Sequence, residues 1–305
     1  MPLLLLLILA LTVGLATGLL VWRLPRTVAP AQPATESARR IGEAVGRHRT
    51  LRRVLRSRMD PAAATGLALT LALLIVICGG VLFGLLAYLV RSNAHLHGID
   101  NSVAKWGNTH GSAFSTDGLN VVTQLGGIYL VVALCVVLAL GVTFVERSVW
   151  VIPFVIAVIG GEEILTLTVK DLAHRVRPAF NPAAASLGPS FPSGHSATAA
   201  AFYACAALLI GRRRGRPARA LLAGLAVGLA VAVAASRVLL DVHWLTDVIA
   251  GLALGWAWFS VCSIAFGGRL LRFGAGAETA ERAMEATSRR TSPGPSRLPV
   301  TKNPT

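Results

Sequence analysis

The amino-acid sequence predicts an all-α fold, a polytopic membrane helix bundle in which six spans form a core and one further helix anchors the N-terminus. The 305 residues are 54% hydrophobic and only 14% charged, and the mean hydropathy is +0.64. Such a chain has too few charged residues to cover the surface of a soluble protein of this size. Apolar runs long enough to cross a bilayer, about 20 residues each, recur along the chain and are separated by basic clusters.

The apolar runs predict seven spans, and the first of them is an anchor. The spans are 3–22, 63–90, 120–144, 149–169, 194–210, 219–236 and 244–266. No basic region precedes the first run, whereas Arg23 and Arg26 follow it. This order favours an uncleaved anchor with its N-terminus outside, with a cleavable signal peptide as the alternative.

Four parts follow from these spans. They are an N-terminal transmembrane anchor (1–22), a basic cytoplasmic segment (23–61), a membrane-embedded core (62–268) and a disordered cytoplasmic tail (269–305). In the basic segment, apolar residues at roughly helical spacing alternate with arginines, which indicates an amphipathic helix on the anionic inner leaflet. A solvated basic linker is the alternative. The tail is rich in Ser, Thr, Pro and Arg, a composition typical of disorder.

The distribution of positive charge predicts the orientation. The formal net charge is +15, and its arginines gather in 23–61, in the turn 211–219 and in the tail. With seven spans, these three segments fall on one side, which the positive-inside rule assigns to the cytoplasm. The pattern therefore indicates a multi-pass protein of the cell membrane rather than a nucleic-acid-binding protein. The segments on the outer side are 91–119, 170–193 and 237–243.

Four cysteines lie inside apolar runs, at Cys78, Cys135, Cys205 and Cys262. Their spacing fits neither a metal site nor a disulfide framework, so we expect small buried side chains.

Three polar motifs fall at the outer ends of consecutive spans. They are Lys170 with Arg177-Pro178, then Pro192-Ser193-Gly194-His195, then Ser236-Arg237 with His243 and Asp247. Three cations with few carboxylates nearby repel one another unless an anion joins them, and guanidinium and ammonium groups match the oxygens of a phosphate. The second motif opens a helix, whose free N–H groups and positive dipole end also favour an anion. Together the motifs predict a phosphate site on the outer side.

The histidines of the same motifs supply reactive groups. His243 and Asp247 are four residues apart and face the same way on a helical turn. A carboxylate bonded to one ring nitrogen fixes the tautomer and leaves the other nitrogen free to attack phosphorus. His195, from another helix, is placed to protonate the leaving oxygen.

These residues resemble the three-part signature of the type 2 phosphatidic acid phosphatase superfamily, in the right order and spacing. The resemblance covers roughly residues 63–266 and implies a lipid phosphatase that needs no metal and no other cofactor. It implies three catalytic residues: His243 as the nucleophile that forms a phosphohistidine, Asp247 as its orienting carboxylate and His195 as the general acid. The phosphate-binding residues that it implies are Lys170, Arg177, Ser193, Gly194 and Arg237.

Other polar residues near the motifs receive simpler interpretations. Because no motif position requires Arg175, we interpret it as a snorkelling basic flank of its span. His174 and Asp241 are expected at the rim of the site or in contact with substrate. Glu163 lies seven residues before Lys170 and shares its helix face, which suggests an internal polar pair.

The sequence leaves more than one function open. The leading hypothesis is hydrolysis of a lipid phosphate or diphosphate at the outer face, with a polyprenyl (undecaprenyl-type) diphosphate as the first substrate. Phosphatidic acid or phosphatidylglycerophosphate is the second. A lipid phosphoryl or head-group transferase and a non-enzymatic membrane protein are the other classes. The partners expected are the lipid phosphate and the membrane, without nucleic acid, and the oligomeric state stays open.

Overall fold

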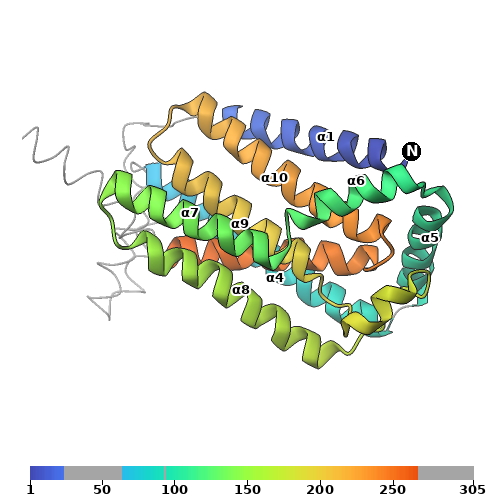
Figure 1. Ribbon diagram of the computed structural model, residues 1–305. Helices are drawn as coiled ribbons and strands as arrows, with labels where there is room; N and C mark the ends of the chain where they lie inside the picture. The colour runs from blue at the N-terminus through green and yellow to red at the C-terminus, as the bar shows by residue number, and fades with distance from the viewer. Residues whose placement is uncertain (24–63, 93, 267–305) are drawn as a thin grey trace, which may run out of the picture. The chain divides into compact units, whose positions relative to one another are not determined.

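The computed structural model describes residues 1–23, 64–92 and 94–266, and in these residues the regular structure is helical (Figure 1). The predicted basic segment 23–61, apart from Arg23, and the tail 269–305 lie outside the described residues. Within the described ranges no strand occurs, so the all-α prediction is confirmed.

The helices follow one another with short connections. They are α1 (Pro2–Arg23), α4 (Ala64–Ser92), α5 (Ala94–His110), α6 (Ala113–Gln124), α7 (Ile128–Glu146), α8 (Val151–Ala173), the 3₁₀ helix η1 (Pro182–Leu187), α9 (Gly194–Gly211) and α10 (Arg216–Leu239). A last helix covers Leu245–Phe266.

Seven of the described helices are long and apolar enough to cross a membrane, which agrees with the predicted number of spans. Their outward faces carry large apolar side chains, such as Phe144, which is 87% exposed. A bilayer covers such side chains, and helices satisfy their own backbone groups there. The chain is therefore a multi-pass membrane protein.

One predicted span, 120–144, is wrong at its start. The chain breaks after α6 and begins a new helix, α7, only at Ile128. Gly126 explains the break, because a Cβ atom there would lie 2.5 Å from Val233 and 2.8 Å from the carbonyl oxygen of His195. The turn at Gly126 packs directly on α9 and α10. A hydropathy pattern does not reveal such a contact between helices, so it could not predict the break.

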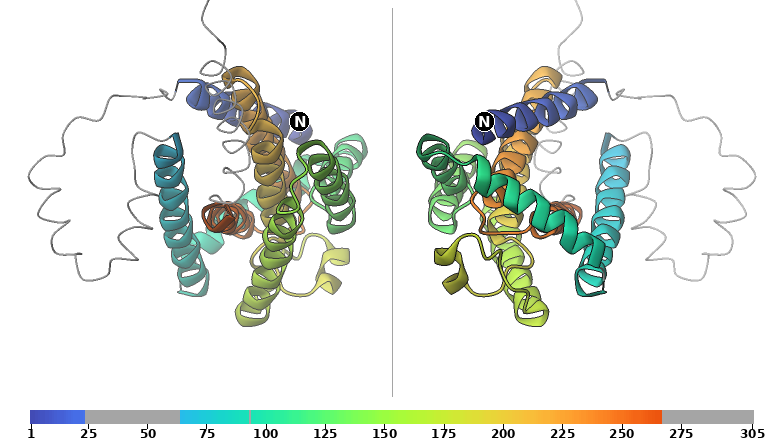
Figure 2. Two further views of the ribbon diagram at one scale, coloured as in Figure 1. Left: turned by 90° about the vertical axis from the view of Figure 1, so that its left-hand side faces the viewer. Right: turned by 90° about the vertical axis from the view of Figure 1, so that its right-hand side faces the viewer.

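The N-terminal helix α1 packs along α10 through glycines (Figures 1 and 2). A Cβ atom on Gly14 would lie 2.8 Å from the carbonyl oxygen of Gly224, and one on Gly224 would lie 2.6 Å from that of Gly14. Small residues of this kind let two membrane helices approach closely. Nearer its start, α1 contributes Leu6 to an apolar cluster with Leu119 of α6.

Helix α9 lies at the centre of the contacts that position the polar motifs. It packs against α7, α8 and α10, and four of its alanines, Ala197, Ala199, Ala200 and Ala201, are fully buried. At its start, the backbone N–H of Ser193 donates to the carbonyl oxygen of Asp247 at 3.0 Å. This bond joins the first turn of α9 to the last helix.

Candidate active site

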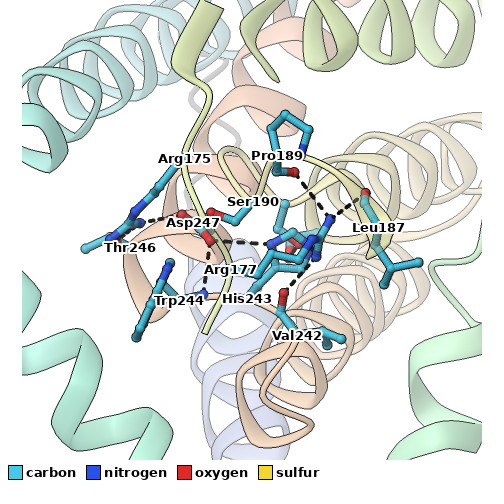
Figure 3. A network of polar contacts seen from close by, with 12 residues as sticks. Arg175, Arg177, Leu187, Pro189, Ser190, Val242, His243, Trp244, Thr246 and Asp247 are labelled. Atoms are coloured by element: carbon cyan, nitrogen blue, oxygen red, sulfur yellow. Dashed lines mark hydrogen bonds and ion pairs between the residues drawn. The ribbon is translucent and has the colours of Figure 1, made fainter. Parts of the chain in front are cut away.

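The candidate site forms where the C-terminal ends of α8 and α10 meet the start of α9 (Figure 3). The loop after α8 supplies Arg177, and the turn after α10 supplies His243. Arg177 is 6% exposed and His243 is 2% exposed. Two segments 66 residues apart in sequence are thus brought into one buried polar cluster.

His243 is held between a carboxylate and a guanidinium. Its Nδ1 lies 3.4 Å from Oδ2 of Asp247, and its Nε2 lies 3.1 Å from Nη1 of Arg177. A guanidinium only donates hydrogen bonds, so Nε2 is the accepting nitrogen. The ring proton therefore belongs on Nδ1, facing Asp247. The backbone N–H of Trp244 donates to the same Oδ2 at 3.0 Å.

Burial lowers the pKa of His243 to about 4, against the opposing effect of Asp247. The neighbouring cations Arg177 and Arg237 lower this pKa further. At neutral pH the imidazole is consequently uncharged and keeps a lone pair on Nε2. A neutral imidazole with its other nitrogen bonded to a carboxylate has the form that a nucleophile needs.

Arg177 uses all five of its N–H groups. Nη1 donates to the carbonyl oxygen of Val242 at 2.7 Å and to His243. Nε and Nη2 donate to the three carbonyl oxygens of residues 187–189, at 2.9 to 3.3 Å. Burial lowers the pKa of Arg177 from its ordinary value, yet an arginine remains a cation. It therefore holds the end of the 3₁₀ loop next to the candidate nucleophile.

The remaining predicted residues lie around the same cluster. Nζ of Lys170 lies 3.9 Å from the point where a Cβ atom on Gly194 would be, so it faces the first turn of α9. Nη1 of Arg237 donates to Oγ1 of Thr123 at 3.1 Å. The titratable groups close enough to act electrostatically on His195 are Arg237, His243, Lys170 and Arg177.

The start of α9 offers fewer free donors than the motif predicts. The N–H of Ser193 is already donated to Asp247, and its hydroxyl accepts a bond from Ser196 at 3.0 Å. The hydroxyl proton of Ser193 is still free to donate to an anion. The next N–H groups, from Gly194 and His195, are in the first turn and have no intrahelical partner.

Arg175 is the residue whose sequence interpretation is wrong. Its side chain is 8% exposed and forms ion pairs with Asp247 and, at 2.7 Å, with Asp100 of α5. A snorkelling flank would instead extend toward water. Arg175 lies only two residues before the motif residue Arg177, and this proximity is the sequence signal that could have indicated a place near the site.

Two further acidic residues lie near the site. Glu162, not Glu163, is the fully buried one, and it accepts hydrogen bonds from Thr166 at 2.7 Å and from Thr198 at 3.0 Å. Glu162 thus joins α8 to α9 within the first two turns of α9. Asp241 is 5% exposed, and its Oδ1 has no partner among the described residues.

A polytopic helical fold with a buried histidine and several cations at one end of its spans suits phosphate chemistry in a membrane. Comparisons with known proteins agree. The model of the PAP2 superfamily matches residues 130–270. Phosphatidylglycerophosphatase B of Bacillus subtilis is 30% identical over 178 residues, which are 57% of this chain and 85% of that protein.

Two further similarities have the same character. A crystal structure of a transmembrane PAP2-type phosphatidylglycerolphosphate phosphatase from Bacillus subtilis matches with a TM-score of 0.58 and 27% identity, covering 64% of this chain and 96% of that one. Decaprenylphosphoryl-5-phosphoribose phosphatase of Mycobacterium tuberculosis is 36% identical over 109 residues, 34% of this chain and 55% of that protein. The chain belongs to the PAP2 superfamily and is a membrane phosphatase of the lipid phosphatase type.

Proposed function

We propose that the protein is a metal-independent phosphatase that hydrolyses a lipid phosphate or diphosphate at the outer face of the membrane through a phosphohistidine. The observation that carries this proposal is the state of His243, whose Nδ1 faces Asp247 and whose Nε2 accepts from Arg177. Only the Nε2 lone pair is then available for attack on phosphorus.

The reaction has two steps that balance. Nε2 of His243 attacks phosphorus, and the bond from phosphorus to the lipid-side oxygen breaks while His195 gives its proton to that oxygen. Water then attacks the phosphohistidine, His195 takes the proton of this water, and inorganic phosphate leaves. An incoming phosphoryl oxygen takes over the N–H that Arg177 donates to Nε2, which frees the lone pair at the moment it is needed.

The cations stabilise charge in both steps. A transferring phosphoryl group carries its negative charge on the three equatorial oxygens. Lys170, Arg177 and Arg237 converge on the cluster, and the first-turn N–H groups of α9 add donors there. Fixed donors in a buried site stabilise a developing charge more than water does.

The orientation belongs to the proposal and rests on the charge pattern. The turn between α9 and α10 contains Arg212, Arg213 and Arg214, and Arg216 begins α10. This turn lies at the ends of these helices opposite to the site. The positive-inside rule puts this turn in the cytoplasm and the site outside. We also propose that residues 62–268 form the phosphatase core and that 1–22 remain as an anchor.

Labelling tests the orientation. In a chain lacking its four native cysteines, Ser186→Cys in the exposed part of η1 is expected to react with an impermeant thiol reagent in intact cells. Labelling of Ser186→Cys only after permeabilisation would move the site to the cytoplasmic face.

A polyprenyl diphosphate is the substrate that we propose first. An outward site meets lipid carriers left in the outer leaflet after polymer synthesis, whereas cytosolic phosphates cannot reach it. The similarity to a decaprenylphosphoryl-5-phosphoribose phosphatase supports a polyprenyl chain. Phosphatidylglycerophosphate is the second candidate, favoured by the longer match to phosphatidylglycerophosphatase B.

The test is phosphate release by purified protein in EDTA from undecaprenyl diphosphate, phosphatidylglycerophosphate and phosphatidic acid. We expect release with wild type, fastest from the diphosphate, and none with folded His243→Ala. Hydrolysis by folded His243→Ala would refute the phosphohistidine. Transfer to an added acceptor alcohol without phosphate release would identify a transferase instead.

A further inference from the structure

Arg175 forms a bridge between two buried carboxylates, one of which is in the proposed active site. One ion pair joins its Nη2 to Oδ2 of Asp100 at 2.7 Å, and another joins its Nη1 to Oδ1 of Asp247. Both aspartate side chains are fully buried. Figure 3 shows Arg175 reaching from the loop after α8 to Asp247.

Thr246 closes the network beside Asp247. Its hydroxyl donates to Oδ2 of Asp100 at 2.7 Å and accepts from Nη1 of Arg175 at 2.7 Å. Its backbone N–H also donates to Oδ1 of Asp100 at 3.1 Å. Asp100 is thereby fixed to the first turn of the last helix, although it belongs to α5.

Both oxygens of Asp247 are consequently occupied by different partners. Oδ1 accepts from Arg175, while Oδ2 accepts from the Trp244 N–H and faces Nδ1 of His243. Rotation of the carboxylate would break the ion pair with Arg175. The orientation of the imidazole depends on that of the carboxylate, as in other sites where an outer partner fixes a reactive histidine.

We propose that Arg175 is a positioning residue that acts on His243 through Asp247, and that Asp100 shares the charge of Arg175. This inference rests on the proposed function, which makes His243 the nucleophile. Asp100, Asp247 and Arg175 together carry a net negative charge. Asp247 therefore keeps enough negative charge to stabilise His243 when that ring gains a phosphoryl group.

The expected effect is on turnover rather than on substrate binding. Loss of an outer partner of a reactive group typically costs 10–100-fold. Arg175→Gln is expected to lower kcat by roughly this factor, about 10–100-fold, with KM for the lipid changed less than about threefold. Arg175→Lys is expected to fall between Arg175→Gln and wild type, because an ammonium keeps the charge but not the fork that reaches both carboxylates.

Two exposed charged residues, one on α5 and one on α6, serve as matched controls. Lys105→Gln removes an exposed cation from α5, and Asp117→Asn removes an exposed carboxylate from α6. Both controls are expected to keep wild-type kcat. Asp100→Asn is expected to lower kcat by a smaller factor than Arg175→Gln, because Arg175 then neutralises Asp247 more completely without releasing it.

A double-mutant cycle separates positioning from general structural damage. In the Asp247→Asn background, Arg175→Gln is expected to lower kcat by less than about threefold more, because its target is already lost. Losses that multiply fully would show that Arg175 acts independently of Asp247 and would overturn the proposal.

Arg175→Gln leaves two buried carboxylates without their cation, so the folding of this variant is measured together with its kcat. If Arg175→Gln does not yield folded protein, Asp100→Asn/Arg175→Gln removes the second carboxylate and is expected to show the same 10–100-fold loss of kcat. Wild-type kcat in either folded variant, beside inactive His243→Ala, would refute the role of Arg175. An active His243→Ala would instead refute the proposed function on which it rests.

Discussion

At the scale of single residues, the two neighbours of His243 decide which of its nitrogens is reactive. Arg177 donates to Nε2, so Nε2 must accept, and the ring proton is left for Asp247. This assignment comes from the chemistry of arginine alone. A lysine at position 177 would keep one charge, but its ammonium group has three N–H donors and could not serve five acceptors.

His195 is expected to matter more for monoesters than for diphosphates. A departing phosphate leaves with its own negative charge, whereas a monoester expels a poorer alkoxide that needs a proton. General acid catalysis contributes about 10²–10⁴-fold, and His195→Ala should approach the upper end for phosphatidic acid and the lower end for a polyprenyl diphosphate. Phosphate release from both lipids in matched detergent measures the difference. Equal losses would leave His195 as a phosphate-binding residue only.

Asp241 is expected to make stability depend on pH. Burial raises the pKa of its carboxyl to about 6, so ionisation above that pH is unfavourable in the folded protein. The destabilisation is complete above pH 6 and disappears as the pH falls toward the ordinary value near 4. Asp241→Asn should therefore raise the melting temperature at pH 7.5 more than at pH 4.5. An equal change at both pH values, or one matched by the exposed Asp117→Asn, would contradict this.

At the scale of elements, the loop after η1 acts on the site through its backbone. Residues 187–189 present three carbonyl oxygens to Arg177. Gly188 adopts a φ of 75° with a ψ of −162°, a combination that is essentially restricted to glycine. The conformation of this one residue determines where the carbonyl groups point.

Gly188→Ala is accordingly expected to lower kcat several-fold while the protein remains folded. The strain of this combination of φ and ψ is about 1–3 kcal/mol for a residue with a Cβ atom, and relief of this strain would shift the carbonyl groups away from Arg177. Gly160→Ala in α8 serves as the control, because a Cβ atom there would meet nothing within 4 Å. Equal kcat for both variants and wild type would show that the loop does not set the position of Arg177.

The elements also show how far sequence reasoning reaches. The spans follow from hydropathy, and the motif residues Arg177 and His243 lie 3.1 Å apart in the structure. The break at Gly126 could not be predicted, because it arises from contact with α9 and α10. The role of Arg175 depends on Asp100, which is 75 residues away and carries no local signal.

At the scale of the whole described part of the chain, α1 packs as a member of the bundle. Its apolar cluster with α6 and its glycine contacts with α10 lie on two neighbours at once. Helix α6 in turn supplies Thr123, which accepts from Arg237. Packing of α1 against α6 therefore helps to position Thr123, which contacts Arg237, one of the cations of the proposed site.

Gly14→Leu is expected to lower the melting temperature of the detergent-purified protein by several degrees. A leucine at this position has no room, since even its Cβ atom would lie 2.8 Å from the backbone of α10, and separated helices lose their van der Waals contact. Gly80→Leu in α4 is the control, because nothing lies within 4 Å of a Cβ atom there. Equal melting temperatures for the two variants would indicate that α1 does not stabilise the bundle.

The glycine contact between α1 and α10 has a consequence for biosynthesis. Gly14 and Gly224 are more than two hundred residues apart, so the ribosome releases the first helix long before its partner exists. During that interval α1 must stay in the bilayer with its glycine face against lipid. The contact can form only after α10 has been made, and a nascent chain that stops before α10 would leave α1 without it.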